Sequence, residues 1–293
     1  MKKLLVFFFF SFSFAVSAQT KLTVENGGRG AHKAIITADK NLPDHTIYRS
    51  AEMSSSAPLP IVLFGNGGCM NNSEGYQNYL NEIASQGYLV IAVGPFEYFL
   101  DDTLTSVREF TKTDKLIEAL DWAFKENGTS GSAYYQKLDT KSVATMGHSC
   151  GGLQAIEASF DPRVKTTIVL NSGILASPPP EQFRASLPAL SLDDLQKIRV
   201  PALYLIGGES DVAYTNAEAN FERISKTAVV LANYPSGHGG TYREAHGGEY
   251  VLPTIAWFNW QLKGQVESKT YFAGEDCDLC QRKDWEVKTK GLQ

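Results

Sequence analysis

The chain has 293 residues, of which 43% are hydrophobic and 20% are charged, and it carries a formal net charge of −5. A chain of this length and composition can bury one large core, so we expect a single main domain. No basic cluster is present, which argues against nucleic-acid binding, because that function needs lysine and arginine gathered on one face.

Residues 1–18 have the pattern of a secretory signal peptide. Two lysines precede an apolar and serine-rich run over residues 4–16, and Ala18 offers a small residue for cleavage before Gln19. A membrane anchor is the alternative, but this run is shorter than the roughly 20 apolar residues that a spanning helix needs. We therefore predict a secreted or periplasmic protein, cleaved near Ala18, with no membrane span in the mature chain.

The next part of the chain alternates predicted strands and helices. Residues 21–60 are expected to supply an antiparallel edge hairpin with a strand at 46–49. Apolar runs predict core strands at 61–64, 88–93, 142–146, 165–170, 200–206 and 228–234. Helical spacing predicts helices at 76–86, 107–125, 151–160, 214–226 and 251–263, with a helical turn at 192–198. Such alternation implies an α/β fold, a mainly parallel sheet with helices on both faces.

Two segments lack this regular pattern. Residues 174–199 contain several prolines and form either a lid over a site or a plain crossover. Residues 264–293 offer little apolar sequence apart from Tyr271-Phe272 and Trp285. We expect this tail to pack on the domain and to be held there by its two cysteines.

A G-x-S-x-G pentapeptide, Gly147 to Gly151, stands where a predicted strand ends and a helix begins. In such a turn the flanking positions need glycine, and the serine hydroxyl rises above the edge of the sheet. The amides at the start of the helix then point at the oxyanion. The pattern predicts Ser149 as a nucleophile. Cys150 is the alternative nucleophile, but centring the turn on it would put His148 where a small residue is needed.

A serine hydroxyl is a weak nucleophile and needs a base, which a third group orients. Asp211 follows the predicted strand 200–206, and His238 follows the predicted strand 228–234. Asp211 is expected to accept the Nδ1 proton of His238, which leaves Nε2 to take the proton of Ser149. Glu209 is the alternative acid and His246 the alternative base, and Asp211 could also be a plain helix cap.

The oxyanion that forms on attack needs two preorganised donors. One is expected to be the Cys150 amide. The other is expected from the glycine-rich loop after the strand 61–64, where we choose Gly68, with Cys69 as the alternative. A shared oxygen would bring these two segments within a few ångströms of each other.

Four cysteines in an exported chain can pair in three ways. The expected nearness of the two oxyanion segments makes Cys69 and Cys150 plausible partners, which would leave Cys277 with Cys280. Free buried thiols are the alternative. A zinc site at Cys277 and Cys280 would need a second pair of ligands, and no Cys or His follows them, so we predict no metal.

The elbow 147–151, the acid loop 208–211 and the histidine loop 237–239 together resemble the α/β-hydrolase superfamily, over most of residues 55–263. Within it they are similar to the bacterial cutinase, chlorophyllase and dienelactone-hydrolase-like esterases. The resemblance implies an α/β-hydrolase catalytic domain over residues 19–263 and ester hydrolysis without a metal or organic cofactor. Cys150 departs from the Met or Gln often found there, and the tail has no counterpart in that branch.

These features predict a secreted serine esterase, expected to be a monomer, that cleaves a small-molecule or polymer ester through an acyl-enzyme. Acetyl, aromatic-acid and polyester substrates all fit. Aromatic residues that could line the substrate cleft, or equally belong to the core, are Phe96, Tyr98, Tyr214 and Tyr242.

Two other functions fit the sequence less well than a serine esterase. A serine exopeptidase of the same fold would need an anchoring site for a peptide terminus, and no extra domain supplies one. A secreted binding protein that kept the fold would be expected to have lost Ser149, Asp211 or His238, and all three are present.

Overall fold

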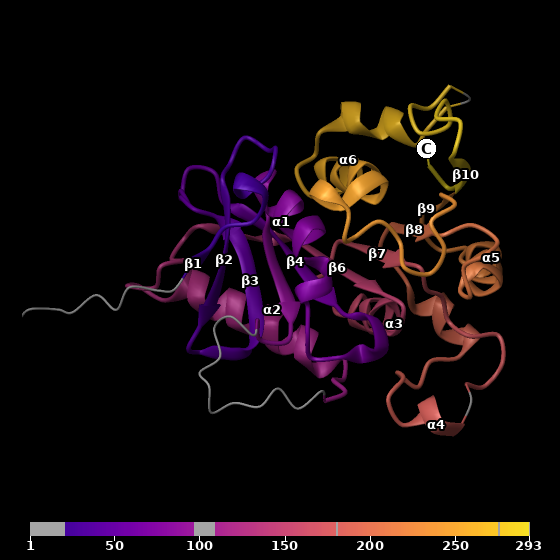
Figure 1. Ribbon diagram of the computed structural model, residues 1–293, viewed down its shortest axis with the longest axis horizontal. Helices are drawn as coiled ribbons and strands as arrows, with labels where there is room; N and C mark the ends of the chain where they lie inside the picture. The colour runs from indigo at the N-terminus through magenta and orange to yellow at the C-terminus, as the bar shows by residue number, and fades with distance from the viewer. Residues whose placement is uncertain (1–20, 97–108, 180, 275, 293) are drawn as a thin grey trace, which may run out of the picture.

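The computed structural model describes residues 21–96, 109–179, 181–274 and 276–292, and Figure 1 shows their arrangement. Within these residues, ten strands form one sheet in the order β1-β2-β3-β5-β4-β6-β7-β8-β9-β10. The strands are β1 (Lys21–Leu22), β2 (Ala34–Asp39), β3 (Leu42–Ser50), β4 (Leu59–Gly65), β5 (Leu89–Val93), β6 (Leu138–His148), β7 (Thr166–Leu170), β8 (Ala202–Ile206), β9 (Val229–Asn233) and β10 (Glu286–Lys290). The six central strands, β5-β4-β6-β7-β8-β9 in sheet order, run parallel. The outer strands β1, β2, β3 and β10 pair antiparallel.

Helices cover both faces of this sheet. Those on one face are α1 (Gln77–Ser85) and α6 (Val251–Gln261), and those on the other are α2 (Asp114–Gly128), α3 (Cys150–Ala158) and α5 (Tyr214–Arg223). A mainly parallel sheet with helices on both faces confirms the predicted α/β fold class.

The apolar side chains of strand β4 pack into two hydrophobic clusters, one on each face of the sheet. Val62 and Phe64 pack into the cluster shared with α1 and α6, whereas Ile61 and Leu63 pack into the cluster shared with α2. Successive side chains of a strand point to opposite faces, so a strand covered on both faces must be apolar throughout.

The predicted edge hairpin is confirmed. Strands β2 and β3 pair antiparallel, and β3 continues antiparallel onto β5. The strand predicted at 46–49 lies inside the longer β3.

The helix predicted at 107–125 begins instead at Asp114, and residues 107–108 lie outside the described residues. Residues 109–111 form no helix because they pair with the loop that follows β4. The Asn71 N–H donates to the Glu109 carbonyl over 3.2 Å, and the Thr111 N–H donates to the Cys69 carbonyl over 2.7 Å. This pairing fixes the position of the loop that carries Gly68.

The sequence pattern implied that β9 is the last strand of the sheet, but the sheet continues beyond it. Strand β10 of the tail adds antiparallel to β9. Its sequence, Glu-Val-Lys-Thr-Lys, has a single strongly apolar residue, and lysines are typical of an exposed edge strand. A search for apolar runs in the sequence therefore does not find this strand.

Hydrophobic burial holds the tail against the domain. Phe272, Leu279 and Trp285 are buried in the core cluster that includes α1 and α6. The disulfide Cys277–Cys280 joins two residues of the tail itself, so it cannot tie the tail to the rest of the chain.

The connection from β7 to β8 contains a short helix α4 (Glu181–Arg184) and a 3-10 helix (Leu192–Lys197), which matches the helical turn predicted at 192–198. None of the described helices is long and apolar enough to cross a bilayer. The predicted signal peptide lies outside the described residues.

Replacing Phe272 by alanine is predicted to lower the free energy of unfolding by about 3–4 kcal/mol, because its ring is only 1% exposed. Urea denaturation measures this change. Val266→Ala is the matched control in the same tail, since that side chain is 69% exposed and its loss should cost less than about 0.5 kcal/mol. Equal effects of the two changes would show that the tail does not pack on the core.

Candidate active site

Ser149 occupies the sharp turn between β6 and α3 and has a left-handed backbone, with φ 53° and ψ −119°. A non-glycine residue holds such a conformation only where its surroundings enforce it. A Cβ added to Gly147 would lie 2.0 Å from the Gly151 carbonyl oxygen, and one added to Gly151 would lie 2.2 Å from the Gly65 backbone. The turn therefore requires glycine at both flanking positions.

Two hydrogen bonds fix this turn to the neighbouring strand. The Ser149 N–H donates to the Leu170 carbonyl over 2.9 Å, and the Ser172 hydroxyl donates to the Ser149 carbonyl over 2.6 Å. Leu170 is the last residue of β7, and Ser172 lies in the loop that follows this strand. The hydroxyl of Ser149 is left free to face the histidine loop.

The three residues predicted as a triad lie within hydrogen-bond distance of one another. His238 Nε2 is 2.9 Å from Ser149 Oγ, and His238 Nδ1 is 2.7 Å from Asp211 Oδ1. A carboxylate only accepts, so Nδ1 carries the hydrogen and Nε2 accepts from the serine hydroxyl. The Asp211 carboxylate is fully buried, whereas the His238 ring is 36% exposed. The His238 ring is thus accessible to a substrate, whereas the Asp211 carboxylate that orients it is shielded from solvent.

The Asp211 carboxylate accepts four hydrogen bonds. Burial alone would raise its pKa, but hydrogen bonds from His238, the Ala213 and Gly207 N–H groups and the Asn171 side chain lower the pKa to about 2. The carboxylate is therefore ionised at any pH near neutrality.

Asn171 is a residue of this site that the sequence did not single out. It follows β7 directly, and its Nδ2 lies 2.6 Å from Asp211 Oδ2 and 3.0 Å from the Gly237 carbonyl oxygen. Its Oδ1 accepts a short hydrogen bond from the Tyr242 hydroxyl. Asn171 thus joins the acid loop to the histidine loop. The only sequence signal was its place at the carboxyl end of a core strand.

His148, the second residue of the pentapeptide, links the elbow to two other loops. Its Nε2 donates to the His238 carbonyl over 2.8 Å, and its Nδ1 accepts from the Tyr76 hydroxyl over 2.8 Å. The Tyr76 oxygen in turn accepts from the Gly67 N–H over 2.9 Å. Burial lowers the pKa of His148 to about 4, so the ring is neutral and can accept at Nδ1.

The alternative acid and base lie elsewhere. His246 Nδ1 is 3.1 Å from Glu82 Oε2, and the His246 N–H donates to the Glu25 carboxylate. Glu209 lies in the acid loop, and its side chain is exposed, whereas that of Asp211 is buried. Ser149 is therefore brought together with His238 and Asp211 and not with these residues.

Cys150 directly follows Ser149, and a Cys69–Cys150 disulfide ties the loop that carries Gly68 to this residue. Cys150 is the first residue of α3, where backbone amides point out of the helix. In the loop after β4, the Gly67 N–H is engaged by Tyr76, and the Cys69 N–H donates to the Asn66 carbonyl over 3.1 Å. These bonds favour Gly68, with φ 65°, over Cys69 as the second donor.

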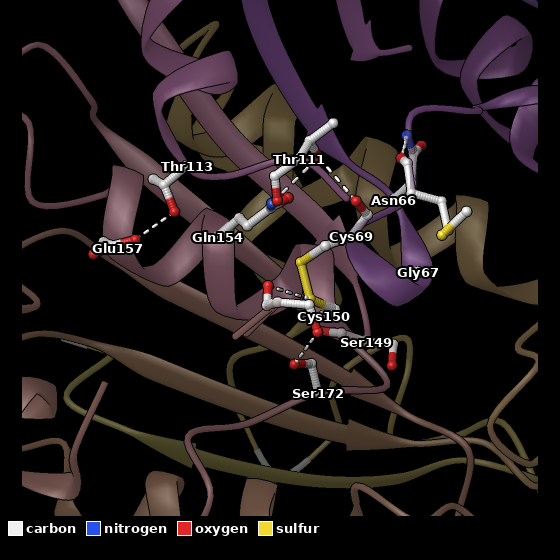
Figure 2. Close-up of a disulfide and its surroundings, with 12 residues drawn as sticks. Asn66, Gly67, Cys69, Thr111, Thr113, Ser149, Cys150, Gln154, Glu157 and Ser172 are labelled. Carbon is white, nitrogen blue, oxygen red and sulfur yellow. Dashed lines mark hydrogen bonds between the residues drawn. A yellow bond between two sulfur atoms is a disulfide. The ribbon is translucent and has the colours of Figure 1, made fainter. Parts of the chain in front are cut away.

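Both predicted disulfides are confirmed. Figure 2 shows the bond between Cys69 and Cys150, whose Cα atoms are 5.1 Å apart, beside Ser149. Cys277 and Cys280 form the second bond, with Cα atoms 5.0 Å apart. Bonded sulfurs leave no thiol for a Cys150 nucleophile or for a zinc site in the tail. Among the described residues, no group of three or more His, Cys, Asp or Glu side chains is placed to hold a metal ion.

Two hollows are lined by residues close to the elbow in sequence, His148 and Leu153, and Ser149 lines neither of them. A polar one of about 780 Å³ is lined by Tyr76, His148, Gly239 and Arg243. An apolar one of about 450 Å³ lies between α3 and the 174–193 connection and is lined by Leu153 and other aliphatic side chains.

The three predicted cleft aromatics that the structure describes do not form one wall. Phe96 and Tyr242 are buried in the core cluster with α1, although Tyr242 also borders the polar hollow. Tyr214 begins α5 and is half-buried. Tyr98 lies outside the described residues.

Together, a mainly parallel sheet, a serine in a strand-to-helix elbow and a hydrogen-bonded Asp-His pair at the same edge define an α/β hydrolase. A sequence profile described as PET hydrolase-like matches residues 66–228, more than half of the chain. The chain belongs to this PET hydrolase-like family and is a hydrolase.

A curated peptidase is also similar to part of the chain. Dipeptidyl aminopeptidase BIII of Pseudoxanthomonas mexicana is 33% identical over 117 residues, which make up 36% of this chain and 16% of that protein. The match therefore spans only a small part of the peptidase.

The pKa of Asp211 predicts a loss of stability in acid. Because the pKa of about 2 in the folded protein lies below the ordinary value of 3.8 for an aspartate, the stabilisation is full above about pH 4 and is lost as the pH falls toward 2. Unfolding in urea between pH 5 and pH 2 should show a decline that is about 2 kcal/mol smaller in Asp211→Asn than in the wild type. An identical pH dependence would contradict the assigned hydrogen bonds.

Proposed function

We propose that the protein is a serine esterase that cleaves carboxylic esters through an acyl-enzyme, with Ser149 as nucleophile, His238 as base and Asp211 as the orienting acid. The observation that carries the proposal is the continuous line of hydrogen bonds from Ser149 Oγ through the His238 ring to the Asp211 carboxylate. Membership of the PET hydrolase-like family supports an ester as the substrate.

The first half of the reaction forms the acyl-enzyme. Ser149 Oγ attacks the ester carbonyl while His238 Nε2 takes its proton. The tetrahedral oxyanion is stabilised by the Cys150 and Gly68 amides, and each such donor contributes about a hundredfold to a thousandfold in rate. His238 then gives the proton to the departing alcohol.

The second half repeats these steps with water. His238 removes a proton from a water molecule, the hydroxide attacks the acyl carbonyl, and the proton returns to Ser149 as the acid leaves. Throughout, Asp211 stays ionised because its pKa is about 2, so it stabilises the imidazolium that forms in each half.

The neutral His148 positions the base in this scheme without touching the substrate carbonyl. Its hydrogen bond to the His238 carbonyl connects the backbone of the histidine loop to the elbow. Asn171 does the same for the acid loop through Asp211 and the Gly237 carbonyl.

We further propose that residues 1–18 direct export and that residues 19–263 act as the catalytic domain, with residues 264–293 as an accessory tail. The two disulfides are compatible with an oxidising compartment outside the cytosol.

A serine peptidase is the second candidate, because the similar curated protein is named a dipeptidyl aminopeptidase. The same three side chains could cleave an amide by the same steps. Dipeptidyl p-nitroanilides separate the two candidates, since an esterase should turn over p-nitrophenyl esters and leave these anilides intact.

The esterase proposal predicts hydrolysis of p-nitrophenyl esters, tested as a series from acetyl to long-chain acyl groups. Ser149→Ala should lower kcat at least a thousandfold, because the nucleophile is lost. Ser54→Ala, at an exposed serine, should leave kcat unchanged. No turnover of any ester by the wild type, or full activity in Ser149→Ala, would overturn the proposal.

A further inference from the structure

We propose that the Cys69–Cys150 disulfide is a covalent strap that positions the oxyanion hole and so sets kcat. This inference rests on the proposed esterase function and goes beyond it, because it gives one of the two disulfides a part in the reaction. The bond joins residues separated by 81 positions in the sequence. One is the proposed donor Cys150, and the other directly follows the proposed donor Gly68.

The covalent path between the two donor segments is short. From Gly68 it passes through one peptide unit to Cys69, across the two sulfurs, and into the first residue of α3. Figure 2 shows the loop that carries Gly67 and Cys69 drawn against the start of α3 beside Ser149. A bond in this place limits how far the two amides can move apart.

The loop has a backbone that needs such restraint. Gly68 and Cys69 both have left-handed conformations, with φ 65° and 51°, and Cys69 is not a glycine. Within the loop, the Cys69 N–H donates to Asn66 over 3.1 Å and the Met70 N–H donates to Gly67 over a long 3.3 Å. The Asn66 side chain also donates to the Met70 carbonyl over 2.8 Å, and none of these three bonds involves the Gly68 N–H.

A second attachment keeps the loop near α3 even without the bond. The Thr111 N–H and hydroxyl donate to the Cys69 carbonyl over 2.7 and 3.0 Å, and Gln154 Nε2 donates to the Thr111 carbonyl over 2.8 Å. Thr113 also donates to the Glu157 carboxylate. Cys150, Gln154 and Glu157 are spaced i, i+4 and i+7, so one face of α3 makes all these contacts.

Loss of the disulfide should therefore lower the catalytic rate without unfolding the protein. If the disulfide is removed, Thr111 and Gln154 still hold the loop in place, but the Gly68 amide is free to relax away from the oxyanion. The expected effect is a fall in kcat with little change in KM, because the restraint acts on charge that develops after substrate binds.

The second disulfide provides a matched control. Cys277–Cys280 lies in the tail, and Cys277 is buried with α1 and α6 on the face of the sheet opposite α3. Removing it should leave the oxyanion hole untouched.

The decisive comparison is between Cys69→Ala/Cys150→Ala and Cys277→Ala/Cys280→Ala, each assayed on a p-nitrophenyl ester well below its unfolding temperature. The first variant should unfold cooperatively and show a kcat lowered about tenfold to a hundredfold, with KM within about threefold of the wild type. The second should keep the kcat of the wild type. Equal kcat values in both variants would overturn the strap.

If the first variant does not fold, chemical reduction of the Cys69–Cys150 disulfide tests the same proposal. In the Cys277→Ala/Cys280→Ala background, dithiothreitol breaks the remaining S–S bond and gives two electrons and two protons to it, becoming a cyclic disulfide itself. If dithiothreitol does not reduce this disulfide, urea at a concentration below the unfolding midpoint is added to make the disulfide accessible. After the reductant and urea are removed, kcat should be low in proportion to the alkylatable thiols, counted by mass, and should return on reoxidation.

Full kcat in protein that carries two alkylatable thiols would contradict the strap while leaving the esterase standing. Absence of turnover by the oxidised wild type would instead count against the proposed function. The two failures are therefore distinguishable.

Discussion

The backbones of β4 and α3 approach so closely at Gly65 and Gly151 that a single added methyl group would collide with a main chain. This contact forces the chain to turn within one residue after β6, and that residue is Ser149 in a left-handed conformation. It also brings the loop after β4 to the start of α3, where Cys69 and Cys150 are joined. The exposure of the serine and the nearness of the two proposed oxyanion donors thus share one steric cause.

The polar groups around the proposed base are fixed by a second set of constraints. Asp211 is buried and accepts hydrogen bonds from His238, Asn171 and two backbone amides, so its charge is stabilised without water. His148 is neutral because it is buried, and this allows it to donate at one nitrogen and accept at the other. Each loop of the site is therefore bonded to a neighbouring loop and not only to its own strand.

The sequence predicted those features that follow a local rule. The pentapeptide around Ser149 implied an elbow, and apolar runs implied the six central strands. Asn171 and Tyr76 were not predicted as site residues, because their hydrogen bonds join segments far apart in the chain and leave no periodic signal. The strand β10 was missed for a different reason, since an exposed edge strand such as Glu286–Lys290 needs few apolar residues.

The central claim is that His238 makes Ser149 nucleophilic, and reaction with a fluorophosphonate followed by peptide mass spectrometry tests it most directly. The account predicts a single adduct, located on Ser149, that forms at least a hundredfold more slowly in His238→Gln at equal folding. An adduct on another residue, or equal labelling rates in the wild type and His238→Gln, would contradict it.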